Sequence, residues 1–141
     1  MVKLILGGAG SGKTKLMIED ANKRSNEIKG TLIYIEDTDK HMHSLEVGVR
    51  FISMENMRIK NYDALYTFVC GLLSANYDIQ YIYIDGLFKI VQNNTENLHV
   101  FLNELDKLTK DSNVDIIISA TLVESEIDPE IQKFVVSAEA L

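Results

Sequence analysis

The chain has 141 residues, about the length of one domain, and carries a formal net charge of −7 from 21 acidic and 14 basic residues. An acidic protein repels phosphate backbones, so this balance argues against a general nucleic-acid binder. No apolar run reaches the roughly 18 residues that a membrane-spanning helix needs, and a membrane role is not expected.

From the N-terminus onward, the sequence alternates between two periodicities. Short, near-continuous apolar runs rich in Ile, Val and Tyr predict buried parallel strands. Stretches with apolar residues at steps of three and four predict helices between them. In chain order we expect a strand at 2–6, a helix at 13–29, a strand at 31–35, a helix at 62–75, a strand at 81–84, a helix at 95–110, and strands at 115–119 and 134–136.

This alternation predicts a single α/β domain over residues 1–141, with three layers and a mostly parallel five-stranded sheet. Ligands of such sheets bind beyond the carboxyl ends of the strands. The segment 37–60 is the least regular part, and two interpretations stay open for it. Either residues 47–52 form another short strand, or the segment is a long loop over the site.

A glycine-rich motif follows the first predicted strand. Residues 7–14 read Gly-Gly-Ala-Gly-Ser-Gly-Lys-Thr, a complete G-x-x-x-x-G-K-T sequence between a strand and a helix. Glycines there allow backbone angles that turn successive N–H groups inward to form an anion site. Lys13 is expected to reach the β and γ phosphates, and the Thr14 hydroxyl to ligate Mg²⁺. The predicted phosphate-binding residues are Gly7, Gly8, Ala9, Gly10, Ser11, Gly12, Lys13, Thr14 and Lys15.

Carboxylates follow two of the other predicted strands. Asp85 ends the third strand, where an aspartate can hold a water of the Mg²⁺ shell. The alternative is that it caps the following helix or begins a turn with Gly86, and the preceding glycine-rich motif favours the Mg²⁺ role. Glu36 and Asp37 follow the second strand. Because no glutamate follows Asp85, one of this pair is the candidate general base, with Glu36 slightly favoured. The alternative is that both are solvated residues at the exit of the strand.

Several other polar positions are interpreted as structural. Ser119 and Thr121 carry hydroxyls at the end of the fourth strand, where such residues are common turn formers. His41 and His43 are interpreted as polar loop residues, because no second cluster at zinc-like spacing accompanies them. The two arginines of segment 37–60 could face a transferred phosphate, with an ordinary surface position as the simpler expectation.

The phosphate loop, the acidic pair at 36–37 and Asp85 with Gly86 together resemble the RecA/KaiC-like branch of P-loop ATPases. The resemblance implies a P-loop NTPase core, a catalytic glutamate just beyond strand two, and a fourth strand between the P-loop and Walker B strands. The chain is also similar, end to end, to short bacterial P-loop proteins described as ATP-binding or loosely as twitching-motility ATPase-like. It has no room for the extra domains of recombinases, helicases and motors, so those roles are not implied.

The expected ligand is a nucleoside triphosphate, ATP with Mg²⁺, and the candidate catalytic residues are Lys13, Glu36 and Asp37. Three functions stay open: slow or partner-dependent ATP hydrolysis in an accessory or switch role, a small-molecule kinase acting on a nucleoside or cofactor, and a catalytically idle ATP-binding module. A protein partner or self-association is compatible with each. Cys70 is the only cysteine, so no internal disulfide can form and the cytoplasm is the expected location.

Overall fold

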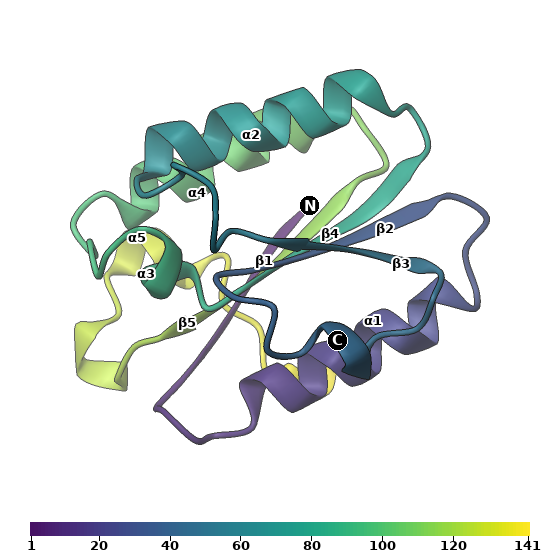
Figure 1. Cartoon of the computed structure of the whole chain (residues 1–141). Coiled ribbons are helices and arrows are strands. Elements are labelled where there is room, and N and C mark those ends of the chain that lie inside the picture. Colours follow the sequence, from purple (N-terminus) through teal and green to yellow (C-terminus); the bar gives the residue numbers. More distant parts are fainter.

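A five-stranded sheet runs through the middle of the structure, with helices on both of its faces (Figure 1). The structure is a computed structural model that describes the backbone of residues 1–141 and every side chain except that of Glu124. All neighbouring strands are parallel, and their spatial order is β1-β5-β4-β2-β3. The strands are β1 (Val2–Gly7), β2 (Thr31–Glu36), β3 (Val49–Ser53), β4 (Ile79–Asp85) and β5 (Asp115–Thr121).

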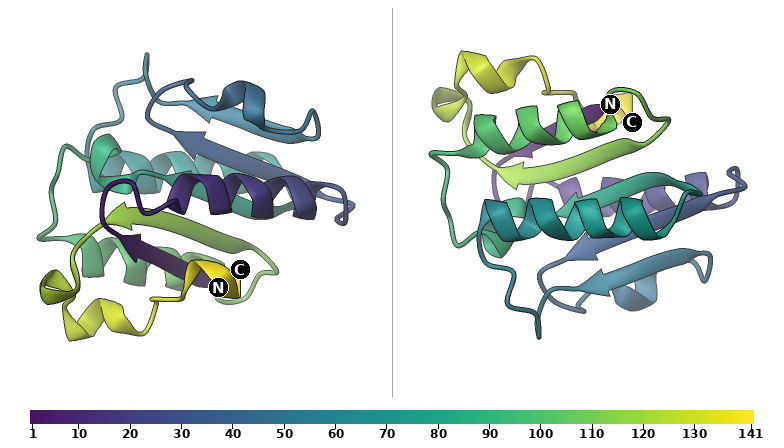
Figure 2. Two further views of the ribbon diagram at one scale, coloured as in Figure 1. Left: turned by 90° about the horizontal axis from the view of Figure 1, so that it is seen from below. Right: turned by 90° about the horizontal axis from the view of Figure 1, so that it is seen from above.

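The helices divide between the two faces of the sheet. They are α1 (Lys13–Ser25), α2 (Tyr62–Ala75), α3 (Leu87–Ile90), α4 (Leu98–Thr109) and α5 (Pro129–Gln132), with short 3₁₀ turns at Met42–Ser44, Glu124–Glu126 and Ala138–Ala140. Helices α2 and α4 lie side by side on one face, and α1 crosses the other (Figure 2). Among the described residues, no helix is long and apolar enough to cross a membrane.

The apolar runs of the strands supply both layers of the core. Successive strand residues point to opposite faces, so Ile82 and Ile84 pack toward α2 and α4, whereas Tyr83 packs with Met17 on the α1 face. All six residues of β2 are buried. Burial on both faces explains why these strands are continuously apolar rather than alternating with polar residues. The predicted α/β class and parallel sheet are therefore confirmed.

The prediction of a strand at 134–136 is wrong. This segment lies beside β1, where the Leu4 N–H donates to the Phe134 carbonyl and the Val136 N–H donates to the Leu4 carbonyl, at 2.8 and 2.9 Å. These bonds make only one isolated parallel bridge, between Leu4 and Val135. Helical turns at Pro129–Gln132 and Ala138–Ala140 leave too few extended residues for a ladder.

The fifth strand comes instead from the segment 37–60. Strand β3 (Val49–Ser53) pairs with β2 at the edge of the sheet, close to the strand proposed at 47–52. The remaining part of the segment is loop, and residues 37, 38, 40 and 41 lie at the end of the sheet where β2 stops. The strand interpretation is thus correct for residues 49–53, and the loop interpretation is correct for the residues that line the end of the sheet.

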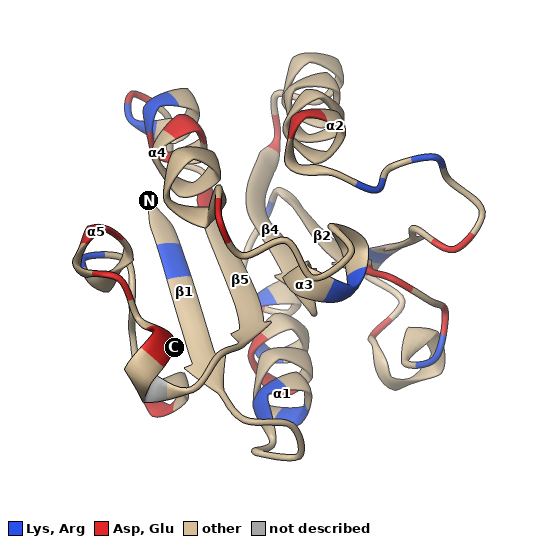
Figure 3. Ribbon diagram, turned by 90° about the vertical axis from the view of Figure 1, so that its left-hand side faces the viewer, with Lys and Arg blue, Asp and Glu red and all other residues tan. Residues whose placement is uncertain are grey.

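The parallel register brings the carboxyl ends of the strands together. Gly7 of β1 lies opposite Thr121 of β5, and Glu36 of β2 lies opposite Asp85 of β4. Because β5 and β4 lie between β1 and β2, residues far apart in the sequence meet where these strands have their carboxyl ends. Figure 3 shows basic positions in α3 and at the start of α1 on this same side of the molecule.

Two glycines give opposite predictions for the stability of this fold. A Cβ on Gly30, just before β2, would lie 2.2 Å from the Asp78 carbonyl oxygen, so Gly30→Ala forces backbone to move and should lower the free energy of unfolding by roughly 1–3 kcal/mol. Gly71 lies in α2 with nothing near its Cβ position, so Gly71→Ala should raise it by about 0.5–1 kcal/mol. Urea unfolding of both variants tests this, and equal effects would contradict it.

Candidate functional site

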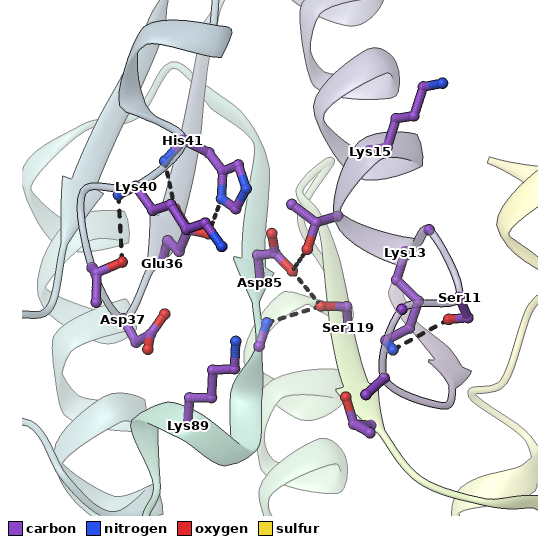
Figure 4. Close-up of a pocket in the computed structure, with 17 residues that line it drawn as sticks. Ser11, Lys13, Lys15, Glu36, Asp37, Lys40, His41, Asp85, Lys89 and Ser119 are labelled. Atoms are coloured by element: carbon purple, nitrogen blue, oxygen red, sulfur yellow. Dashed lines mark hydrogen bonds and ion pairs between the residues drawn. The ribbon is translucent and has the colours of Figure 1, made fainter.

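A cavity of about 580 Å³ opens at the carboxyl edge of the sheet (Figure 4). Its walls come from the loop between β1 and α1, the loop after β2, the ends of β4 and β5, and the short helix α3. With the exception of Gly7 and Gly8, every residue predicted to bind phosphate or Mg²⁺ lines it, as do Glu36 and Asp37. The structure therefore brings the predicted site residues into one place.

The glycine-rich loop makes a tight turn from β1 into α1. The Ser11 N–H donates to the Gly8 carbonyl at 3.2 Å. Gly10 and Gly12 have φ angles of 75° and 86°, in the left-handed region that other residues rarely adopt. Gly12 precedes the first residue of α1, and no side-chain hydrogen bond caps this end of the helix. The N–H groups of the first turn of α1 are thus left for an external acceptor, and anions suit that position.

The Lys13 side chain folds back over this turn. Its Nζ donates to the carbonyl oxygens of Gly7 and Gly8, at 3.0 and 2.9 Å. Partial burial lowers the pKa of Lys13 below its ordinary value, with Asp85 opposing the shift and Lys89 adding to it. The Ser11 Oγ accepts a third hydrogen bond from Nζ, at 3.4 Å. All three partners are neutral oxygens, so an anion in the cavity would be a stronger partner.

Asp85 is the most strongly bonded side chain of the site. Its Oδ1 accepts hydrogen bonds from Thr14 Oγ1 at 3.2 Å and from Ser119 Oγ at 2.7 Å, and its Oδ2 accepts from the Tyr34 hydroxyl at 2.8 Å. Ser119 Oγ also accepts from the Gly86 N–H at 2.9 Å. Asp85 is only 3% exposed, so these donors replace the water that the carboxylate has lost. Ser119 therefore holds Asp85 and Gly86 in place and is more than a turn former.

The Tyr34 hydroxyl acts only as a donor to this carboxylate. Burial, followed by the neighbouring charge of Asp85, raises the pKa of Tyr34 far above its ordinary value of 10. The phenol consequently keeps its proton and donates a hydrogen bond to the Asp85 carboxylate. Its ring is stacked with those of Tyr83 and Phe51, at centroid distances of 5.6 and 6.3 Å, which fixes the direction of the hydroxyl.

Thr14 and Asp85 form a donor set that fits Mg²⁺. Both present oxygen atoms, the ligands this ion prefers, and their oxygens already lie in contact. Among the residues whose side chains are described, no group of three or more His, Cys, Asp and Glu residues gathers to hold a metal ion. Two protein oxygens match an ion that takes its other ligands from water and phosphate.

Glu36 is bound by a residue that the sequence did not connect with it. The carboxylate is 5% exposed, and its Oε2 lies 2.5 Å from His41 Nδ1 while its Oε1 accepts from the His41 N–H at 3.3 Å. Burial raises the pKa of Glu36, and the hydrogen bond from His41 opposes the shift. His41 is thus more than a polar loop residue. Asp37 also lines the cavity and is half-buried, but its carboxylate has no contact like the one between Glu36 and His41.

The cavity has a charge balance unlike that of the chain. Four lysines line it against three carboxylates, whereas the whole chain carries −7. The lysines are Lys13, Lys15, Lys40 and Lys89. Within the described side chains, none of the four takes part in an ion pair. Such a concentration of free positive charge suits a polyanionic ligand.

The arginines lie elsewhere. Arg50 and Arg58 are exposed and do not line the cavity. Arg24, at the far end of α1, donates to Asp20 Oδ2 at 2.9 Å and to the Tyr81 hydroxyl at 2.8 Å. Arginine is therefore absent from the described lining of the cavity, and the basic residues there are lysines.

Sequence reasoning missed several residues of this site. Tyr34 lies inside an apolar run that indicates core, whereas Ser119, at the end of the fourth predicted strand, has the features of a turn former. Lys89 follows Asp85 by one helical turn, which is a weak signal that could have been used. The contact between His41 and Glu36 depends on how the loop turns after β2, and no periodicity encodes that turn.

The shifted pKa of Glu36 makes a testable prediction about stability. The folded protein holds this proton more tightly than the unfolded chain does, so the free energy of unfolding should fall as the pH rises from about 4.5 through the higher folded pKa. Glu36→Gln removes the ionisation and should flatten this decline, whereas the exposed Glu55→Gln should not. Urea unfolding between pH 4 and 7 measures the slopes, and indistinguishable slopes for wild type and Glu36→Gln would refute the prediction.

The chain matches no protein-family model and no curated protein.

Proposed function

We propose that this chain binds a nucleoside triphosphate, ATP with Mg²⁺, in the cavity at the carboxyl edge of the sheet and hydrolyses it slowly in an accessory or switch role. The contact between Thr14 and Asp85, residues 71 apart in the sequence, is the observation that carries the proposal. It joins the end of the G-x-x-x-x-G-K-T loop to the carboxylate after the apolar strand β4. A phosphate-binding loop and a metal-binding aspartate need this proximity, and a chance glycine-rich turn does not.

The binding residues have distinct tasks in this proposal. The N–H groups of the loop and of the first turn of α1 bind the phosphate oxygens, and Lys13 turns from the loop carbonyls to the β and γ phosphates. Thr14 and Asp85 would hold Mg²⁺, which neutralises charge on the phosphates when bound. In this proposal, these groups would form a P-loop NTPase site of the RecA/KaiC-like type.

Hydrolysis requires a base for the attacking water. Glu36 lies opposite Asp85 on the neighbouring strand, and burial raises its pKa, which makes the carboxylate a stronger proton acceptor. The water oxygen forms a bond to the γ phosphorus, its proton passes to Glu36, and the bond from the γ phosphorus to the β–γ bridging oxygen breaks. The products are ADP and inorganic phosphate.

Slow turnover follows from the arrangement around this base. Both oxygens of Glu36 contact His41, so the carboxylate has to exchange a hydrogen bond with His41 for one with water. His41 belongs to the loop that leads away from β2 and lines the cavity. Binding and loss of the γ phosphate can thus alter this loop, which supports a switch role.

The first prediction from this proposal concerns the affinity for nucleotide. Lys13→Ala removes the ammonium group from the phosphate loop and should weaken ATP–Mg²⁺ binding by about 100-fold or more, since charge-assisted hydrogen bonds to phosphate are lost. Lys107→Ala, an exposed position on α4, should leave affinity unchanged. Isothermal titration calorimetry measures both, with unfolding curves confirming that each variant is folded. Wild-type affinity in Lys13→Ala would remove the basis of the proposal.

The second prediction concerns turnover. Glu36→Gln keeps the shape of the side chain but cannot accept the proton, so ATP hydrolysis should fall by roughly 100-fold while affinity changes little. Asp37→Asn, on the adjacent residue, should retain most of the activity. Phosphate release under saturating ATP measures the rates. Loss of activity only in Asp37→Asn would make Asp37 the base, and unchanged activity in Glu36→Gln would indicate an idle binding module.

A further inference from the structure

Lys89 occupies a fixed position on the wall of the cavity formed by β4 and α3. Gly86 has a φ of 73°, which lets the chain turn sharply from Asp85 into α3, and the Lys89 N–H donates to the Gly86 carbonyl at 3.0 Å. The other three residues of α3 are buried, and they are Leu87, Phe88 and Ile90. Lys89 is the exposed residue of this helix, so the packing of its neighbours directs its side chain toward the cavity (Figure 4).

The charge of Lys89 is not balanced by the protein around it. Among the described side chains, the Lys89 ammonium group takes part in no ion pair and no hydrogen bond, although Asp37 and Asp85 line the same cavity. It lies close enough to Lys13 to lower the pKa of that residue. Two ammonium groups facing one cavity repel each other, and an anion between them would convert this repulsion into attraction.

The position of Lys89 indicates which part of an anionic ligand it would meet. Lys13 and the loop amides come from β1 and α1, at one side of the cavity, whereas Lys89 follows β4, with β5 between the two. The loop amides hold the phosphates nearest to α1. The phosphate that extends from the loop toward β4 is the terminal one, because Asp85 and the candidate base Glu36 lie there.

We propose that Lys89 binds the terminal phosphate of the nucleoside triphosphate and makes the site prefer triphosphate over diphosphate. The inference rests on the proposed function. It names the residue by which the site would distinguish a nucleotide that has a γ phosphate from one that lacks it. It also supplies, within one chain, a second cation opposite Lys13. Lys40 is the competing candidate, but it lies on the loop after β2 and no buried neighbours fix its direction.

The test compares two nucleotides across matched lysine variants. Calorimetry with Mg²⁺ and either a nonhydrolysable ATP analogue or ADP should show that Lys89→Met weakens binding of the analogue on the order of tenfold and of ADP less than twofold. Lys89→Arg should keep the preference. Lys40→Met should change it little, and Lys107→Met should change neither affinity. Unfolding curves without nucleotide should match wild type, since Lys89 is exposed.

The outcomes separate this inference from the proposed function. If wild type binds neither nucleotide, the proposed function and the inference fail together. If wild type binds both, and Lys89→Met weakens them equally or not at all, only the inference is overturned. A loss of preference in Lys40→Met alone also overturns it. Should Lys89→Met prove unstable, Lys89→Gln provides the same comparison with a polar side chain.

Discussion

The buried carboxylate of Asp85 is the interaction on which the rest of the site depends. Three hydroxyl groups from α1, β2 and β5 converge on it, so one side chain connects the helix after the glycine-rich loop to the centre of the sheet. Removing hydrogen-bond partners from a buried charge costs several kcal/mol of stability, so the structure around Asp85 depends on these three donors. The Thr14 hydroxyl among them is also the group expected to ligate Mg²⁺. The atoms that would bind Mg²⁺ therefore also support the local structure.

The distribution of charge shows how an acidic protein can offer a site for an anion. The net charge of −7 describes the whole surface, whereas the cavity gathers lysines from separate elements against fewer carboxylates. Because short-range interactions dominate at physiological ionic strength, the ligand responds to the cavity and not to the total charge. The same acidic surface disfavours nucleic acid. Composition thus limits the class of partner without deciding the local ligand.

Glu36 and Lys89 divide the proposed chemistry into two separable parts. Glu36 ends β2 and is held by His41, five residues later on a loop, whereas Lys89 is held by the packing of α3 against the core. The carboxylate that would activate water therefore depends on a loop, and the cation that would read the terminal phosphate depends on a rigid helix. Such an arrangement suits a protein whose binding is robust and whose turnover responds to the conformation of the loop after β2.

The sequence by itself determined the α/β class, three of the helices, four of the strands and the position of the glycine-rich loop, because apolar periodicity and glycine placement are local properties. It did not determine the fifth strand: residues 134–136 are apolar and residues 49–53 are partly so, and only packing against β1 or β2 separates a bridge from a ladder. Nor did it reveal the partners of Asp85 and Glu36 or the direction of Lys89. Those contacts join elements distant in the chain, so only the tertiary structure, through strand order and parallel register, decided them.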